Sequence, residues 1–199
     1  DIGIGRLPVS SLSQARAVVN KIIRYHNTPT TFGDWRNSVT FVGDDEDGRI
    51  HMRQANNLAR KIDTNYPDYN VNKILFDAYK QVATAGGQSS PDVNEDIDNA
   101  MKRGTLFMCY VGHGGETGWA HERVLKVNDV NNWTNRNNMP LFLTATCEFS
   151  RYDDPERTSA GEYVLLNPDG GGIGLMTTTR LVYSSPNYEL SQTFTDYAF

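Results

Sequence analysis

Short β-rich segments alternate along this chain with longer segments whose apolar residues recur at helical spacing. The β-rich segments predict strands over 38–43, 71–76, 105–111, 139–147 and 170–179. The helical spacing predicts helices over 10–27, 52–66, 89–104, 127–133, 159–167 and 187–199. The last three strands are apolar on both faces, which is typical of a parallel sheet covered by helices on both sides. We therefore expect a three-layer α/β fold with a central, mainly parallel sheet.

Length and charge narrow the classes of protein to consider. A chain of 199 residues suits one compact domain, which we expect to span 1–199. A net charge of -5 argues against general binding to nucleic acids or membrane surfaces, which need basic patches. The segment 187–199 resembles a helix cut in mid-course, so we expect a piece excised from a longer protein.

No metal or cofactor is predicted. Cys109 and Cys147 are too few for a disulfide framework and do not form a zinc knuckle. The acidic turn 44–48 (DDEDG) has some features of a calcium loop. However, Gly43 stands where the first ligand belongs and Gln54 where the closing glutamate belongs, so the turn is no EF-hand.

Two of the predicted strands end in reactive side chains. His113 follows the strand that ends at Val111, and Cys147 follows Thr146. The interval between them leaves room for a right-handed helical crossover, so the two strands can be neighbours, about 4.8 Å apart. In open α/β sheets, sites form beyond the carboxyl ends of the strands. The two side chains are therefore expected to face each other across a narrow gap.

A thiol and an imidazole at this position fit nucleophilic catalysis. A thiol with a pKa of ~8.5 is only slightly ionised at neutral pH, and a nearby imidazole makes it a competent nucleophile. Backbone N–H groups of the glycine-rich 112–115 loop and of Cys147 can stabilise an oxyanion. A cysteine at a strand end is more often buried structure, and a histidine flanked by glycines is often a turn residue. Their joint occurrence favours catalysis, whereas Cys109, inside its strand, is expected to be inert core.

At the level of whole motifs the chain resembles a known family. The stretches YVGHGGETGW, LFLTATCEF and IGRLPVSSLSQARAVVNKIIRY are similar to the gingipain-type cysteine peptidases, which have a caspase-like fold. The stretch FVGDDEDGRIHMRQANNLA is most similar to the PorU branch of that family, the cell-surface sortases of the type IX secretion system. The resemblance spans nearly the whole chain.

This resemblance implies roles for individual residues. Cys147 would be the nucleophile and His113 its partner, with the backbone N–H groups of Gly114 and Cys147 forming the oxyanion hole. The family also has an acidic residue that orients the histidine. That residue maps into the 44–48 turn, where we favour Asp45 over Asp44.

The resemblance also implies substrate-binding residues. Arginine-specific members have an acid near the base of the first specificity pocket, and by rough matching this place falls on Arg49, which would repel a basic substrate side chain. Tyr183 matches a pocket-wall aromatic, and Glu116 matches a position beside the catalytic histidine that can line the cleft. Trp119 is expected to be structural, and His121 is a candidate substrate contact.

The function implied is acyl transfer at a peptide bond by a cysteine peptidase or sortase. The resemblance to the PorU branch implies that the substrates are the C-terminal sorting domains of exported proteins and that lipopolysaccharide is the acceptor. It also implies other secretion-system subunits as partners. The location would then be the surface of a Gram-negative bacterium. Three alternatives stay open: a non-catalytic scaffold of the same fold, a secreted gingipain-like protease, and a metal hydrolase that uses the acidic turn with His113 or His121.

Overall fold

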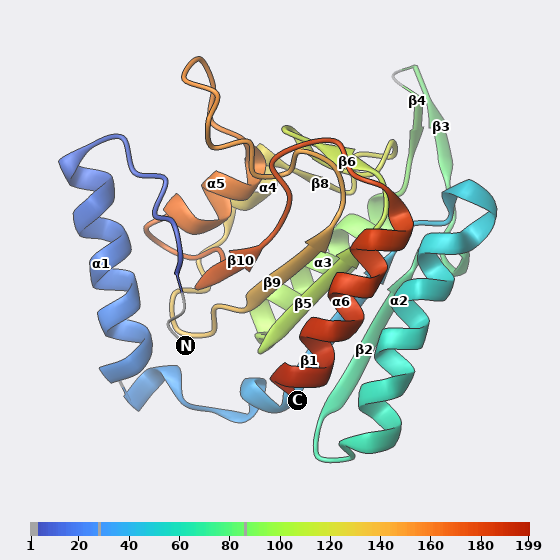
Figure 1. Ribbon diagram of the computed structural model, residues 1–199, viewed down its shortest axis with the longest axis horizontal. Helices are drawn as coiled ribbons and strands as arrows, with labels where there is room; N and C mark the ends of the chain where they lie inside the picture. The colour runs from blue at the N-terminus through green and yellow to red at the C-terminus, as the bar shows by residue number, and fades with distance from the viewer. Residues whose placement is uncertain (1–3, 28, 86) are drawn as a thin grey trace.

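A five-stranded parallel sheet forms the centre of the protein. The computed structural model describes residues 4–27, 29–85 and 87–199, and Figure 1 shows helices on both faces of the sheet. The strands are β1 (Ser38–Gly43), β2 (Asn70–Leu75), β5 (Phe107–Val111), β9 (Leu141–Ala145) and β10 (Gly174–Met176), in the spatial order β10-β9-β5-β1-β2. The expected three-layer α/β fold is confirmed.

The strand order creates a switch point in the sheet. From β1 the chain moves outward to β2, returns to the other side of β1 with β5, and then adds β9 and β10 in the opposite direction. Ligands of such sheets bind beyond the carboxyl ends of the strands where the direction reverses. In this fold that place lies between β1 and β5, next to the loop that follows β9.

Helices cover the sheet because each strand alternates the direction of its side chains. In β5, Phe107, Cys109 and Val111 pack on one face, and Met108 and Tyr110 pack on the other. The first face is covered by α2 (Glu46–Asn65) and α6 (Ser184–Ala198). The second is covered by α3 (Pro91–Arg103), α4 (Val127–Asn132) and α5 (Ala160–Leu166), and α1 (Leu12–Asn27) contacts α5. Both faces of the sheet are therefore buried, as the apolar strands predict.

Smaller elements lie at the edges of this framework. An antiparallel hairpin is formed by β3 (Val82–Thr84) and β4 (Gly87–Ser89), and a small antiparallel sheet by β6 (Gly114–Gly115), β7 (Gly118–Trp119) and β8 (Leu125–Lys126). Single turns of 3-10 helix are found at Pro29–Thr31, Asp34–Asn37 and Phe76–Ala78. Across the described parts of the chain, none of the helices is long and apolar enough to cross a membrane.

Local signals in the sequence locate most helix ends correctly. Ser11 precedes α1, and its Oγ accepts a hydrogen bond from the N–H of Gln14 at 3.2 Å. Ser90 and Pro91 begin α3, and Gly104 ends it with a positive φ of 92°.

The start of α2 differs from the prediction. The helix begins at Glu46 rather than at Met52, and its first turn is not regular. Asp47, Gly48 and Arg49 have left-handed backbone angles, with φ of 50°, 62° and 67°. This turn folds the acidic segment back over the carboxyl edge of the sheet.

Candidate active site

The sheet register brings His113 and Cys147 to the same level. Val111 of β5 and Ala145 of β9 are register partners, and the N–H of Gly112 donates to the carbonyl of Ala145 at 3.2 Å. Each of the two reactive residues lies two positions beyond its member of this pair. The expectation that the two strands are neighbours is therefore confirmed.

The loops that carry the two residues are in direct contact. A Cβ atom on Gly114 would lie 2.6 Å from Oγ1 of Thr146 and 2.8 Å from the carbonyl of Gly118. Only a residue without a side chain allows the His113 loop to approach the residue before Cys147 this closely. Gly114, the expected oxyanion-hole residue, thus lies beside the cysteine loop.

The backbone of His113 is held at both of its polar groups. Oδ2 of the buried Asp44 accepts a hydrogen bond from its N–H at 2.8 Å. Its carbonyl accepts hydrogen bonds from the hydroxyl of Tyr110 at 2.5 Å and from the N–H of Ala120 at 2.8 Å. A Cβ on Gly112 would lie 2.3 Å from the Cβ of Asp44, so this arrangement also requires a glycine.

The imidazole of His113 faces the acidic turn. Its Nε2 lies 3.0 Å from Oδ2 of Asp47 and 3.9 Å from Oε2 of Glu46. The ring is stacked with that of His121 at 5.2 Å and meets the ring of His51 edge-on, also at 5.2 Å. The hydrogen bond to His113 lowers the pKa of the Asp47 carboxyl. An ionised carboxylate can only accept, so Nε2 carries the proton and Nδ1 remains for other partners.

The carboxylate beside the imidazole is therefore not the predicted one. Asp45 lies against Gln81, whose Nε2 donates to Oδ2 of Asp45 at 3.0 Å and to Oε1 of Glu122 at 3.2 Å. Burial raises the pKa of both carboxyl groups. The left-handed turn explains the difference, because it directs Asp47 toward His113 while Asp45 points to the hairpin side. The sequence carries no signal for this turn beyond Gly48.

The loop of Cys147 is fastened to the segment after β10. The Thr178 hydroxyl donates to the carbonyl of Thr146, and the N–H of Glu148 donates to the carbonyl of Arg180 at 3.2 Å. The half-buried thiol itself lies 3.7 Å from the carbonyl of Val182. Cys147 is thus held on a supported loop, as a nucleophile requires.

Cys109 provides the contrast. It is fully buried within β5, and desolvation raises the pKa of its thiol strongly. A thiol of this kind stays protonated and unreactive at neutral pH. The expectation that Cys109 is core is confirmed.

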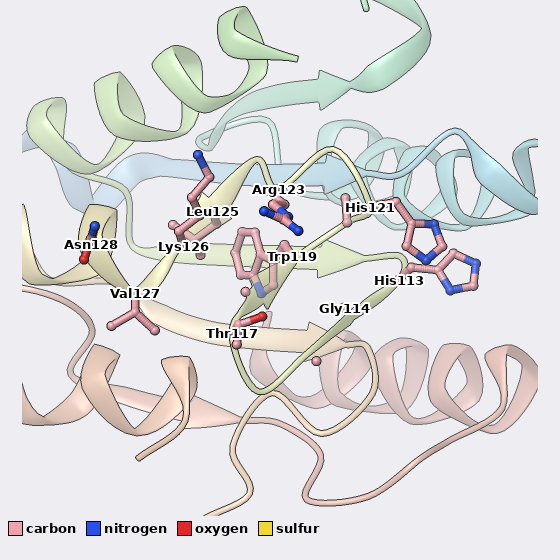
Figure 2. A pocket seen from close by; sticks show the side chains of 13 residues that line it. His113, Gly114, Thr117, Trp119, His121, Arg123, Leu125, Lys126, Val127 and Asn128 are labelled. Atoms are coloured by element: carbon pink, nitrogen blue, oxygen red, sulfur yellow. The ribbon is translucent and has the colours of Figure 1, made fainter. Parts of the chain in front are cut away.

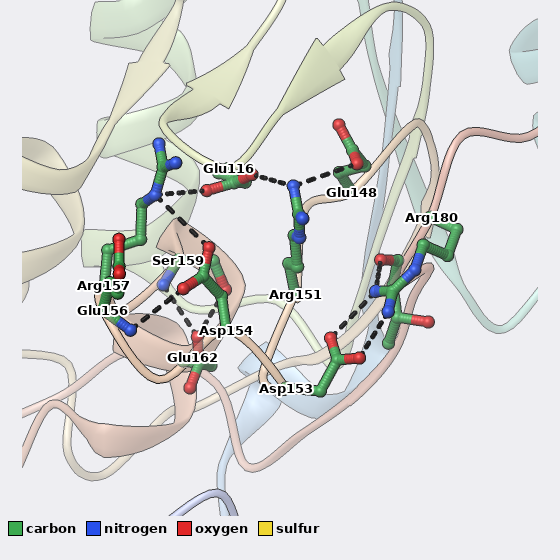
Figure 3. Close-up of polar contacts among 11 residues, drawn as sticks. Glu116, Glu148, Arg151, Asp153, Asp154, Glu156, Arg157, Ser159, Glu162 and Arg180 are labelled. Carbon is green, nitrogen blue, oxygen red and sulfur yellow. Dashed lines mark hydrogen bonds and ion pairs between the residues drawn. The ribbon is translucent and has the colours of Figure 1, made fainter.

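Glu116 connects the histidine loop to the cysteine loop. Its carboxylate pairs with Nη1 of Arg151 at 2.8 Å and with Nε of Arg157 at 3.3 Å, as Figure 3 shows. Arg151 also reaches Oε1 of Glu148 at 3.5 Å. The side chain of Glu116 is 13% exposed; Arg151 hydrogen-bonds to its Oε1, and Arg157 makes an ion-pair contact with its Oε2. In this geometry Glu116 supports the loops; the substrate contact that we expected stays a prediction.

The remaining expected substrate-binding residues lie on the rim. Arg49 is exposed, and its Nε lies 2.7 Å from Oδ2 of Asp77, so a carboxylate partly compensates its charge. Tyr183 is 85% exposed and precedes α6, next to Val182. Trp119 is fully buried and stacks on Tyr110 at 4.3 Å, as a structural residue does.

A pocket of about 720 Å³ extends from His113 along the loops that follow β5. Figure 2 shows His113 and His121 at one end and Val127 and Asn128 at the other, with Thr117 and Trp119 between them. The pocket therefore reaches the imidazole of His113, whereas Cys147 is not among the residues that line it.

Backbone strain is concentrated in the same region. In the described part of the chain, the non-glycine residues with positive φ are Asp47, Arg49, Ala120, Arg123 and Glu148. All of them lie in segments that follow β1, β5 or β9 at the carboxyl edge, either in loops or in the irregular first turn of α2. Unfavourable backbone angles of this kind collect at functional sites, where the surrounding structure enforces them.

A group of three residues has a composition suited to metal binding. Asp47, His51 and His113 each offer a ligand atom, and these atoms lie within 4.8 Å of one another. Neither Asp47 nor His51 stands out in the sequence as a site residue. Their spacing of four positions is the one available signal, and it is common in helices.

Comparison with known proteins identifies the family of the chain and agrees with its fold. Over residues 1–199 the chain matches the family described as peptidase family C25. No curated protein matches it. Among solved structures it is similar to the Arg-specific cysteine proteinase gingipain R (RGPB), with a TM-score of 0.77 and 19% identity over 97% of this chain and 43% of that chain.

Two further structures are similar. The complex of Porphyromonas gingivalis RgpB pro- and mature domains gives a TM-score of 0.80 and 17% identity, over 98% of this chain and 45% of that chain. A structure described as a protease gives a TM-score of 0.67 and 17% identity, over 90% of this chain and 37% of that chain. At such identities the likeness shows a shared fold, the gingipain caspase-like fold. The chain spans less than half the length of each of these structures.

Proposed function

The chain belongs to peptidase family C25, a family of cysteine peptidases, and on that premise we propose that Cys147 and His113 form its catalytic dyad. The observation that carries this proposal is the register of the sheet. Val111 and Ala145 are paired, and His113 and Cys147 each follow two residues after one member of that pair. The contact between their loops at Gly114 and Thr146 supports it further.

The proposed reaction is acyl transfer. The thiolate of Cys147 attacks the carbonyl carbon of a peptide bond, and the developing oxyanion accepts hydrogen bonds from the N–H groups of Gly114 and Cys147. His113 takes the thiol proton and gives it to the leaving amine, so that the C–N bond breaks and a thioester remains. Water, or an amine in a sortase, then releases the acyl group.

Asp47 is the proposed positioning residue for His113. Its carboxylate lies 3.0 Å from Nε2, which leaves Nδ1 for the thiol and the leaving group. Since a positioning residue acts on catalysis rather than on substrate affinity, Asp47→Asn should lower kcat about tenfold or more with little change in KM. The matched control is Asp45→Asn, which removes a carboxylate next to Gln81. Its kcat/KM should lie closer to that of wild type than the kcat/KM of Asp47→Asn.

A proposal about the substrate and the acceptor of this reaction rests on the resemblance of residues 41–59 to the PorU branch. We propose that the enzyme removes C-terminal sorting domains from exported proteins and joins the new carboxyl end to a lipopolysaccharide amine at the surface of a Gram-negative bacterium. Other secretion-system subunits would deliver the substrates. Mass spectrometry of products formed with and without an added amine distinguishes transfer from hydrolysis.

The test of the dyad is peptide cleavage by purified protein. Cys147→Ala and His113→Ala should each abolish cleavage of an unfolded protein substrate, while Cys109→Ala should not. Cleavage that survives Cys147→Ala but disappears with a chelator would instead establish a metal hydrolase. Full activity in the absence of both dyad side chains would refute the proposal.

A further inference from the structure

His51 is a buried histidine whose ring nitrogens make no well-formed hydrogen bond. Its side chain is 8% exposed; among the described residues Nδ1 has no hydrogen-bond partner, and Nε2 has only a contact of 3.5 Å with Oδ2 of Asp47. Leaving buried polar atoms unsatisfied costs about 1–3 kcal/mol for each group. The ring nitrogens of His51 are therefore available to a ligand that is not a protein atom.

The His51 ring is directed at the side chains that face His113. Its Nε2 lies 3.5 Å from Oδ2 of Asp47, and its ring meets that of His113 edge-on at an interplanar angle of 87°. The same oxygen of Asp47 lies 3.0 Å from Nε2 of His113. One carboxylate oxygen and two imidazole nitrogens thus converge from α2 and the loop after β5.

We infer that Asp47, His51 and His113 form a site for a divalent transition metal such as Zn²⁺, and that metal binding switches the proposed peptidase off. Zn²⁺ binds imidazole nitrogens and carboxylate oxygens at about 2.0–2.2 Å, and tetrahedral ligands around it are then roughly 3.3 Å apart. The contacts of 3.0 and 3.5 Å made by Asp47 are close to that separation. Two histidines and a carboxylate form a ligand set typical of zinc.

The neighbouring groups are compatible with a cation. Oε2 of Glu46 lies 3.9 Å from Nε2 of His113 and 2.8 Å from Nδ1 of His121, so a second carboxylate adds negative charge beside the three ligands. Three protein ligands leave one position for water. The site is also reached from the pocket that His113 and His121 line.

Occupation of this site would remove the base of the dyad. This step rests on the proposed function. A metal on Nε2 leaves the proton on Nδ1, so the ring can no longer accept a proton from the thiol of Cys147. The metal also takes Asp47 away from its positioning role. Zn²⁺ would therefore act as a reversible inhibitor through the imidazole of His113 and not through the thiol of Cys147.

The first experiment measures the metal site without any requirement for activity. Zn²⁺ is titrated, in competition with a chromophoric chelator, into wild-type protein and into Cys147→Ala. The titration is repeated on two double variants, Cys147→Ala with His51→Gln and, as the matched histidine control, Cys147→Ala with His26→Gln. We expect one Zn²⁺ per chain with Cys147→Ala alone and with His26→Gln, and at least tenfold weaker binding with His51→Gln. Unfolding curves without metal verify that each variant is folded, and Asp47→Asn provides a second variant with the same expected loss.

Three results would overturn the inference. Equal Zn²⁺ affinity with and without His51→Gln removes His51 from the site. Loss of binding on Cys147→Ala relative to wild type assigns the metal to the thiol. In the second experiment, peptide cleavage is compared with and without Zn²⁺ within each protein, and an equal fractional inhibition of wild type and His51→Gln refutes the regulatory role. A chain that cleaves nothing refutes the proposed function and the inhibition together, while the titration still decides the metal site.

Discussion

Gly114 approaches Thr146 so closely that a Cβ atom on the glycine would lie 2.6 Å from the threonine Oγ1. The first residue belongs to the histidine loop and the second precedes Cys147. The close contact between the two loops sets the relative position of the proposed dyad, His113 and Cys147.

Gly114→Ala should reduce peptide cleavage by about a hundredfold or more, because a small displacement of catalytic groups has effects of that size. The matched control is Gly115→Ala, since a Cβ there meets no described atom within 4 Å. Steady-state kinetics on both variants, with circular dichroism to verify folding, makes the comparison. Equal activity of the two variants would show that the loops do not need this contact.

The two thiols should differ in their reaction with iodoacetamide. Cys147 is half-buried on a loop, whereas Cys109 is fully buried with a raised pKa, so only Cys147 should be alkylated in the folded protein. Mass spectrometry of labelled peptides before and after denaturation measures both rates. A Cys147 that reacts no faster folded than unfolded would favour the non-catalytic scaffold.

Asp44→Ala should impair both stability and activity. The buried carboxylate accepts the N–H of His113 at 2.8 Å and that of Glu46 at 3.1 Å, and alanine leaves both without an acceptor. Each unsatisfied group costs about 1–3 kcal/mol. Urea unfolding and kcat/KM measure the two effects, and Asp44→Asn, which keeps one acceptor oxygen, should lie between alanine and wild type. An unchanged unfolding midpoint for Asp44→Ala would contradict this assignment.

Glu116→Gln should loosen the cysteine loop. The change leaves Arg151 and Arg157 without their shared carboxylate, at a cost of about 1 kcal/mol in the free energy of unfolding, which high salt should reduce. Hydrogen exchange of residues 147–157 measures the local effect. Asp153→Asn removes an exposed pair with Arg180 and is the control. If both variants change exchange equally, Glu116 has no special role in joining the loops.

The stability of the protein should depend on pH through Lys21. Its ammonium donates to the carbonyls of Val164, Leu165 and Asn167 at the end of α5, and burial lowers its pKa from 10.5 to about 7. Between pH 7 and pH 10.5, Lys21 is mostly protonated in the unfolded chain and mostly deprotonated in the folded chain. Rising pH therefore stabilises the folded state, by at most about 1.4 kcal/mol per pH unit.

The measurement is the free energy of unfolding of wild type minus that of Lys21→Met, determined in urea from pH 7 to pH 10. This difference should rise with pH. The corresponding difference for Lys102→Met, at an exposed position of α3, should stay nearly flat. If the difference between wild type and Lys21→Met does not change with pH, Lys21 keeps its proton in the folded protein.

Local patterns predict most of the framework correctly. The strands of the parallel sheet and the α-helices of the described residues lie close to their predicted places, apart from the start of α2. Burial on both faces selects continuous apolar strands, and amphipathic helices leave a 3.6-residue period. The short strands β3, β4 and β6–β8 were not predicted. They have two or three residues each, which is too short for any hydrophobic period.

The sequence likewise predicts some residues of the candidate site and not others. The positions of His113 and Cys147 at neighbouring strand ends are readable from the chain, since a parallel sheet brings all carboxyl ends to one edge. The partner of the imidazole is not readable. The structure has Asp47 in that place, while Asp45 contacts Gln81.

The sequence by itself determined the layers of the fold and the two apolar strands whose ends carry His113 and Cys147. These features depend on which residues are buried, and burial leaves a periodic signature. Only the tertiary structure decided which acid faces His113, that Glu116 is held by two arginines, and that His51 is buried beside Asp47 without a well-formed hydrogen bond. Those relationships depend on a left-handed turn and on contacts between loops distant in the chain, and neither leaves a period that a sequence can show.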